Sequence, residues 1–191
     1  MMKRIGILGD IGSGKSHIAK KFGYPIFNAD QEVAKLYKKD KIIFKKLKKI
    51  LPKYFNKFPI KKKQITNAIL DNKQNLKKII KIIHLEIKKK LNLFLKKNEN
   101  KKIIILDIPL LLENKINKRG DILVFVESKK KEILKRLKKR SNFNQKLLNK
   151  FKKIQLSLDY KKKKSDFIIK NDFNDKTAKN YVKIILSHTY K

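Results

Sequence analysis

Short, largely apolar runs alternate along this chain with stretches in which apolar residues recur every three or four positions. The apolar runs predict five β-strands, at residues 5–8, 26–28, 103–107, 122–126 and 165–171. The stretches between them predict helices that bury one face. Strands that are apolar throughout are typical of a parallel sheet that is covered on both sides. The pattern therefore predicts an α/β protein with about five parallel strands and helices on both faces.

One region of helical spacing is longer than a connection between strands requires. The lysine-rich residues 38–100 contain an apolar helical stripe, made of Leu76, Ile79, Ile80, Ile83, Ile87, Leu91 and Phe94. Pro52 and Pro59 interrupt this region, so we expect several helices there rather than one. A charged helical insertion between two strands is often a subdomain that covers the substrate. Residues 38–100 are therefore interpreted as a substrate-binding insertion.

A second helical region spans residues 129–164. Residues 129–140 predict a basic helix, which ends at a short polar break. The helix expected after the break carries one apolar face, made of Leu147, Phe151, Ile154 and Leu158. Two helices joined by a polar turn suit a mobile lid. The last predicted helix covers residues 175–188 and is capped by Asn174 or Asp175.

A glycine-rich loop follows the first predicted strand. It fits the pattern G-x-x-x-x-G-K-[ST] through Gly9, Gly14, Lys15 and Ser16. Residues 16–22 predict the helix that this motif requires, and a chance glycine turn would rarely coincide with both a strand and a helix. Glycines let successive N–H groups turn toward a phosphate, and the helix N-terminus adds its positive dipole end. The sequence therefore predicts an ATP site made of Asp10, Ile11, Gly12, Ser13, Gly14, Lys15, Ser16 and His17.

Two oxygen-bearing side chains are candidates for binding Mg²⁺ beside this loop. In such sites the hydroxyl that follows the lysine ligates the ion, and an acid at the end of a later apolar strand is the usual second anchor. Ser16 supplies the hydroxyl, and Asp107 ends the apolar run at residues 103–107. The alternative for Asp107 is an ordinary surface aspartate at a strand end. We therefore expect Mg²⁺ to bind through Ser16 and Asp107, while Lys15 reaches the β- and γ-phosphates.

Four further side chains are weighed as candidates for the reaction site. Asp30 lies between the second strand and a helix predicted at residues 31–37, and ligands of open α/β sheets lie beyond the carboxyl ends of the strands. Asp30 could instead cap its helix, and the two roles can coexist. Arg140 near the joint of the predicted lid could neutralise a transferring phosphoryl group, whereas Arg136 is interpreted as a surface cation. His84 lies beside the apolar stripe, where a lone histidine is more often packed than catalytic.

The charge of the chain is strongly positive. Lysine and arginine number 53 against 16 acidic residues, which gives a net charge of +37. Such an excess ordinarily suggests a nucleic-acid binder. Here the excess is spread along the chain and is almost entirely lysine, whereas arginine is the residue that reads base edges bidentately. We interpret the lysine excess as a bias in surface composition of the kind that an A+T-rich coding sequence produces, and we expect no dedicated nucleic-acid function.

Other features of the composition exclude several classes of protein. The chain has no cysteine, which excludes disulfides, thiolate metal sites and a cysteine nucleophile. No apolar run approaches the ~18 residues that span a bilayer. The glycine loop begins too close to the first residue to leave room for a cleavable signal. We expect a monomeric, cytoplasmic protein that does not bind membranes.

Several segments resemble the motifs of dephospho-CoA kinases, which are P-loop kinases. Residues 6–16 resemble the motif GLTGGIGSGKS, residues 28–30 resemble a DAD element, and residues 107–113 resemble D-x-P-L-L-F-E. The lid arginines, a glutamine and an A-D-F-V-I-x-N segment follow in the same order, at Arg136, Arg140, Gln155 and residues 165–171. The resemblance covers nearly the whole chain. It departs from the family pattern where Leu8 replaces threonine, Asp10 replaces glycine and Leu85 replaces proline.

The resemblance implies a fold and a reaction. The fold is a three-layer P-loop NTPase-type fold in a single kinase domain, residues 1–191, with residues 38–100 as the substrate-binding insertion and residues 129–164 as the lid helices. The reaction moves the γ-phosphate of ATP to the ribose 3′-hydroxyl of dephospho-CoA and gives coenzyme A. Two alternatives stay open: a kinase of another small hydroxyl compound, such as a nucleoside or nucleotide, and a nucleic-acid-binding ATPase.

The resemblance also implies roles for individual residues. The catalytic residues would be Asp30, which accepts the proton of the 3′-hydroxyl, with Lys15 and Arg140 neutralising charge. The residues expected to bind dephospho-CoA are Asp30, His84, Asp107, Pro109 and Leu110. The small-molecule partners implied are ATP and dephospho-CoA, with Mg²⁺ as the cofactor.

Overall fold

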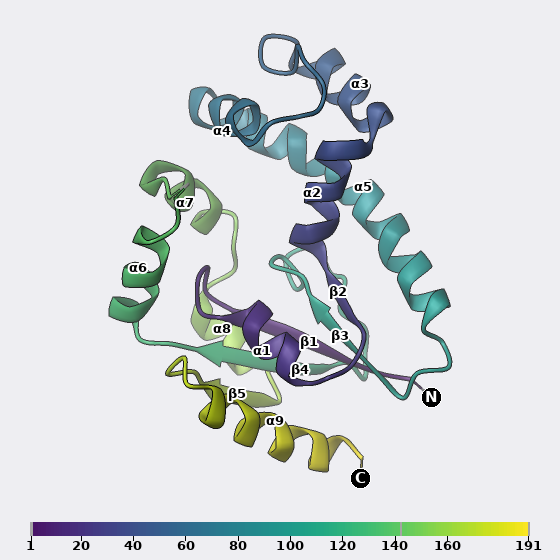
Figure 1. Cartoon of the computed structure of the whole chain (residues 1–191), viewed down its shortest axis with the longest axis vertical. Helices are drawn as coiled ribbons and strands as arrows, with labels where there is room; N and C mark the ends of the chain where they lie inside the picture. Colours follow the sequence, from purple (N-terminus) through teal and green to yellow (C-terminus); the bar gives the residue numbers. More distant parts are fainter. Residues whose placement is uncertain (1, 142, 191) are drawn as a thin grey trace. The chain divides into compact units, whose positions relative to one another are not determined.

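The centre of the fold is a five-stranded parallel sheet, in a computed structural model that describes residues 2–141 and 143–190. The strands are β1 (Lys3–Gly9), β2 (Ile26–Asn28), β3 (Ile103–Asp107), β4 (Ile122–Glu127) and β5 (Phe167–Lys170). Their order in the sheet is β2-β3-β1-β4-β5, and every neighbouring pair is parallel (Figure 1). The glycine-loop strand β1 therefore lies in the middle, between β3 and β4. The predicted parallel α/β sheet is confirmed.

The chain divides into two compact units. The sheet unit comprises residues 1–28, 98–143 and 154–191, and the helical unit comprises residues 29–97 and 144–153. The helices of the sheet unit are α1 (Lys15–Lys21), α6 (Lys130–Lys138), α8 (Leu158–Lys163) and α9 (Asp175–Thr189). The helices of the helical unit are α2 (Ala29–Lys39), α3 (Lys41–Ile50), α4 (Lys62–Asp71), α5 (Lys73–Lys97) and α7 (Gln145–Lys152). None of these described helices is both long and apolar enough to cross a membrane.

Successive side chains of a strand point to opposite faces of the sheet, so the core of the sheet unit lies on both of its faces. Ile5 and Ile7 of β1 belong to a buried cluster with residues of α1 and α9, including Ile18 and Val182. The opposite face is crowded at Gly6, where a side chain would meet Leu111 and Leu123. Glycine at this position of β1 therefore lets Leu111, in the turns after β3, pack directly on the strand.

The helical unit has an apolar core and local caps of its own. The stripe predicted on α5 is buried at Leu76, Ile79, Ile83, Ile87 and Leu91. The Asp40 side chain accepts hydrogen bonds from the first amides of α3, and Lys150 of α7 donates to the last carbonyls of α4, Ile69 O and Leu70 O, at 2.5 and 3.1 Å. As predicted, several helices form here, because Pro52 and Pro59 lie in the connection between α3 and α4.

Most of the predicted elements lie within a few residues of their expected bounds. Strands β2 and β3 match the prediction residue for residue, and β1 and β4 each extend slightly beyond it. Strand β5 is shorter than expected, because only residues 167–170 pair with β4. Helix α9 is capped by Asn174, one of the two predicted residues, whose side chain accepts from Lys176 N and Thr177 N.

The prediction of a single helix after the polar break is wrong. Helix α7 ends at Lys152, and a separate helix, α8, begins at Leu158. Between them, the Leu156 amide donates to the Glu113 side chain at 3.0 Å, and Ser157 caps α8 by accepting a hydrogen bond from Tyr160 N at 3.2 Å. These bonds take the backbone out of the helical pattern. Ile154 and Leu158 therefore do not share a helix with Leu147 and Phe151.

Candidate active site

The glycine loop runs from the end of β1 to the start of α1. Gly9, Gly12 and Gly14 have φ values of 143°, 88° and 93°, which side chains rarely adopt. Each is also crowded: a side chain at Gly12 would meet Ile133 and Leu137 of α6. Gly14 is the left-handed residue at which α1 begins. The three glycines are therefore required both by the backbone conformation and by close packing around the loop.

Lys15 binds the loop itself in this structure. Its Nζ donates to Asp10 O at 2.7 Å and to Gly9 O at 3.2 Å. Nucleotide phosphates would compete with these carbonyl oxygens for the ammonium group. Ser16 is exposed at the second position of α1, near the positive end of the helix dipole.

Asp10, which departs from the glycine of the family motif, is accommodated by the loop. Among the described residues, positive φ at a non-glycine occurs only at Lys115 and Phe173, so the backbone at Asp10 does not require glycine. The Asp10 carboxylate accepts a hydrogen bond from Ile11 N at 2.7 Å. The carboxylate thus takes a loop amide that would otherwise be available to an anion.

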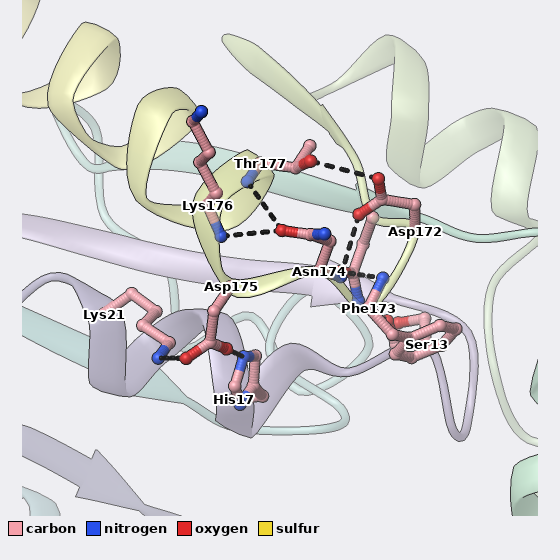
Figure 2. A network of polar contacts seen from close by, with 10 residues as sticks. Ser13, His17, Lys21, Asp172, Phe173, Asn174, Asp175, Lys176 and Thr177 are labelled. Atoms are coloured by element: carbon pink, nitrogen blue, oxygen red, sulfur yellow. Dashed lines mark hydrogen bonds and ion pairs between the residues drawn. The ribbon is translucent and has the colours of Figure 1, made fainter.

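His17 is part of a polar cluster with α9 (Figure 2). Its Nε2 lies 2.9 Å from Asp175 Oδ1, while Lys21 Nζ lies 2.6 Å from Asp175 Oδ2. The hydrogen bond from Lys21 holds the pKa of the Asp175 carboxyl below its usual value, with a further contribution from His17. In this structure the His17 ring is therefore held by α9, and the cluster joins α1 to α9.

Asp107 is buried at the carboxyl end of β3. It pairs in register with Asn28 at the end of β2, and Asn28 Nδ2 donates to Asp107 Oδ2 at 2.5 Å. Gly9, Asn28 and Asp107 thus end three adjacent parallel strands at the same edge of the sheet. Pro109 and Leu110 lie in the turns that follow Asp107.

The residues at this edge fit Mg²⁺ as an ion that arrives with a nucleotide. The described residues contain no group of three or more His, Asp or Glu side chains that could hold a metal by themselves. Mg²⁺ does not need one, because it is usually bound through one or two carboxylates together with waters and substrate phosphates. The Ser16 hydroxyl and the Asp107 carboxylate are oxygen donors of the required kind.

Two of the predicted site residues belong to the helical unit. Asp30 is exposed in the first turn of α2, two residues after Asn28. An acidic side chain at this position also interacts favourably with the positive end of the helix dipole. His84 is half-buried on α5, beside the buried stripe residues Ile83 and Ile87. Within the described part of the chain, His84 Nε2 has no hydrogen-bond partner.

The predicted lid arginines differ in their surroundings. Arg140 is exposed just beyond the end of α6. Arg136 is also exposed, but its guanidinium lies over the Phe173 ring, 4.2 Å from the centroid. Phe173 in turn is one of the residues that a side chain at Gly14 would meet. Arg136 is therefore packed beside the glycine loop, which its interpretation as a surface cation did not include.

Two residues that contact the loop were missed as functional candidates. The Ser13 carbonyl accepts hydrogen bonds from Ser128 Oγ at 2.9 Å and from Asn171 Nδ2 at 2.8 Å. Ser128 follows β4 and Asn171 follows β5, at the sheet edge where the loop begins. Their position at the ends of apolar strands is the same signal that identified Asp107, but neither side chain carries the charge that drew attention to that aspartate.

Comparison with known proteins identifies the family. The family model described as dephospho-CoA kinase matches residues 3–177. The chain belongs to the dephospho-CoA kinase family. The dephospho-CoA kinase of Wolbachia pipientis wMel is 33% identical over 187 residues, which cover 95% of each chain. The one from Rickettsia typhi is 37% identical over 173 residues, covering 88% of this chain and 87% of the relative.

A solved structure agrees with the family fold. Dephospho-CoA kinase from Campylobacter jejuni superposes with a TM-score of 0.64 at 21% identity, covering 98% of this chain and 97% of that chain. At this identity the likeness shows the fold alone. The resemblance inferred from the sequence motifs is confirmed, and with it the P-loop kinase type of fold.

Proposed function

We propose that the site at the carboxyl edge of the sheet carries out the reaction of the family through the residues predicted from the sequence. That reaction is the ATP-dependent phosphorylation of dephospho-CoA to coenzyme A, and the acceptor is the ribose 3′-hydroxyl. The observation that carries the proposal is the glycine loop at the head of α1, in a chain that matches the family over residues 3–177. Another kinase or a nucleic-acid-binding ATPase is not favoured by that match.

The glycine loop would bind the triphosphate of ATP. The loop amides and the start of α1 supply N–H donors and a positive dipole end, which together favour an anion. Lys15 would exchange Gly9 O and Asp10 O for β- and γ-phosphate oxygens. The full set assigned to ATP is Asp10, Ile11, Gly12, Ser13, Gly14, Lys15, Ser16 and His17. His17 would have to leave Asp175, or contribute only its backbone.

Mg²⁺ is assigned to Ser16 and Asp107. When bound with ATP, the ion would neutralise part of the negative charge of the β- and γ-phosphates. Asn28 holds one carboxylate oxygen of Asp107 and so fixes the orientation of the group. The contribution of the chain is to present these oxygens at the strand edge next to the loop.

Phosphoryl transfer to an alcohol also needs a proton acceptor and further neutralisation of charge. Asp30 is assigned as the acceptor of the 3′-hydroxyl proton, because it is an exposed carboxylate two residues beyond the end of β2. Arg140 would stabilise the charge that develops on the transferring group. His84, Asp107, Pro109 and Leu110 are assigned with Asp30 to dephospho-CoA, with residues 38–100 as the substrate-binding insertion and residues 129–164 as the lid.

The remaining expectations concern the oligomeric state, the cellular location and the partners of the enzyme. We propose that it acts as a monomer in the cytoplasm, with ATP and dephospho-CoA as its partners and without a dedicated role on nucleic acid. The lysine excess would then act through a general attraction of anionic substrates, an effect that weakens as salt increases.

The test measures ADP production with dephospho-CoA, nucleoside monophosphates and single-stranded DNA as alternative partners. We expect turnover with dephospho-CoA alone, and coenzyme A as the product. Lys15→Ala should abolish this turnover, because the variant lacks the ammonium group expected at the β- and γ-phosphates. Turnover that is faster with a nucleotide acceptor, or that depends on DNA, would refute the proposed function.

A further inference from the structure

The Ser13 carbonyl, in the middle of the glycine loop, is held by two side chains, each from the residue that follows a different strand. Ser128 Oγ donates to it at 2.9 Å and Asn171 Nδ2 at 2.8 Å. Both lone-pair directions of a carbonyl oxygen can thus be used. Ser13 is buried, with 1% of its surface exposed, and its bond from Asn171 is buried as well, whereas the bond from Ser128 is partly buried.

The direction of this carbonyl determines the direction of the next amide. A trans peptide group is planar, and its C=O and N–H point in opposite directions. The peptide that joins Ser13 to Gly14 therefore turns its N–H away from Ser128 and Asn171. Gly14 stands at the start of α1, where the N–H groups face outward from the helix end.

Asn171 is itself held firmly enough to act as a support. It is 5% exposed, its backbone amide donates to Glu127 O at 2.7 Å, and its Oδ1 accepts from Phe173 N at 3.0 Å. These bonds also determine which end of the side-chain amide faces Ser13, because the oxygen is already used by Phe173. The space beside Gly14 is filled by Asn171 and Phe173, so the loop has little room to rotate this peptide.

We propose that Ser128 and Asn171 are positioning residues that orient the Gly14 N–H toward the phosphates of a nucleotide. Neither side chain touches the nucleotide; each acts through the Ser13 carbonyl. The inference rests on the proposed function only in that the loop binds ATP, and it does not depend on the acceptor. Because two donors hold one carbonyl, the loss of either one loosens the orientation only partly, and the loss of both releases it.

The experiment measures the dissociation constant of ATP by calorimetry for wild type, Ser128→Ala, Asn171→Ala and the double variant, all in the full-length chain. Each single variant should weaken ATP about two- to threefold, and the double variant about tenfold or more, a larger effect than the product of the two. In steady-state kinetics of the same variants, KM for ATP should rise while KM for dephospho-CoA stays unchanged.

Asn174→Ala is the matched control. Asn174 lies in the same turn and caps α9 through Lys176 N and Thr177 N, so its loss lowers stability without reaching Ser13. Its melting temperature should fall while its affinity for ATP stays that of wild type.

An ATP affinity of the folded double variant within twofold of wild type overturns the inference. If Asn171→Ala does not fold, Asn171→Asp replaces it, because it has nearly the same volume and can still accept from Phe173 N but presents an oxygen to the Ser13 carbonyl. If the affinity of the double variant with Asn171→Asp for ATP falls about tenfold and stays low at high salt, the inference is supported. If the loss of affinity disappears at high salt, it is an effect of the added charge, and the inference is overturned. A wild type that binds ATP without phosphorylating dephospho-CoA refutes the proposed function and leaves this inference standing.

Discussion

Lys161 of α8 and Glu113, in the turns after β3, form a buried ion pair in the sheet unit. Lys161 Nζ lies 2.7 Å from Glu113 Oε1, and the two side chains are only 1% and 9% exposed. Lys161 also donates to Gln155 Oε1 at 3.0 Å, while Glu113 accepts from Leu156 N. The pair thus fastens α8 to the last residue of the segment 107–113. We predict that breaking it from one side destabilises the protein strongly.

The magnitude follows from the distance and the burial. At 2.7 Å the attraction is about 6 kcal/mol for an effective dielectric constant of about 20, most of which is offset by the loss of hydration. Removing one partner leaves the other charge buried, which costs about 3–5 kcal/mol. For an m-value of about 2 kcal/mol per molar urea, the unfolding midpoint of Lys161→Met should fall by about 1.5–2.5 M.

The assay is urea unfolding of Lys161→Met, Glu113→Gln and the double variant, followed by circular dichroism. The double variant carries no unpaired buried charge, so its stability should return to within about 1.5 kcal/mol of wild type. Lys53→Met is the control, because Lys53 and Asp71 form an ion pair that is 74% and 53% exposed; it should change nothing measurable. Losses for Lys161→Met and Glu113→Gln that simply add in the double variant would refute the reasoning, as would a Lys161→Met midpoint equal to that of wild type.

Two predictions concern the reaction itself. Asp30→Asn should lower kcat by roughly 10²- to 10⁴-fold, because the amide cannot accept the proton, while calorimetry should show an unchanged ATP affinity; an unchanged kcat would remove Asp30 from this role. Asp10→Gly should lower KM for ATP about five- to tenfold, because it frees the Ile11 amide and removes a negative charge from the loop. A KM for ATP that stays constant or rises in steady-state kinetics would contradict this account of Asp10.

The sheet could be predicted from the sequence because its signals are local. Strand β3 contains a continuous apolar run, residues 103–106, between Lys102 and Asp107, and the glycine loop is a contiguous motif. The break between α7 and α8 could not be predicted in this way. Ile154 and Leu158 continue the helical spacing, and the helix is interrupted by Glu113, which is 43 residues away from Leu156.

The same distinction applies to the site. Lys15 and Asp107 are charged residues in recognisable sequence contexts, a glycine loop and the end of an apolar run. They could therefore be proposed as site residues from the sequence alone. Ser128 and Asn171 are neutral, and they reach Ser13 across 115 and 158 residues. Their importance depends on which side chains the parallel sheet brings to one edge, and neither spacing nor composition contains that information.

The two carbonyl oxygens that accept from Lys15 in this structure have a consequence for selectivity. Lys15 must give up both carbonyl partners to bind a phosphate, so only part of its attraction to the phosphate charge contributes to the binding energy. The discrimination between a full polyphosphate tail and a single small anion then depends on how many backbone donors the ligand reaches at once. Inorganic phosphate, which reaches few of them, should be a poor competitor of ATP.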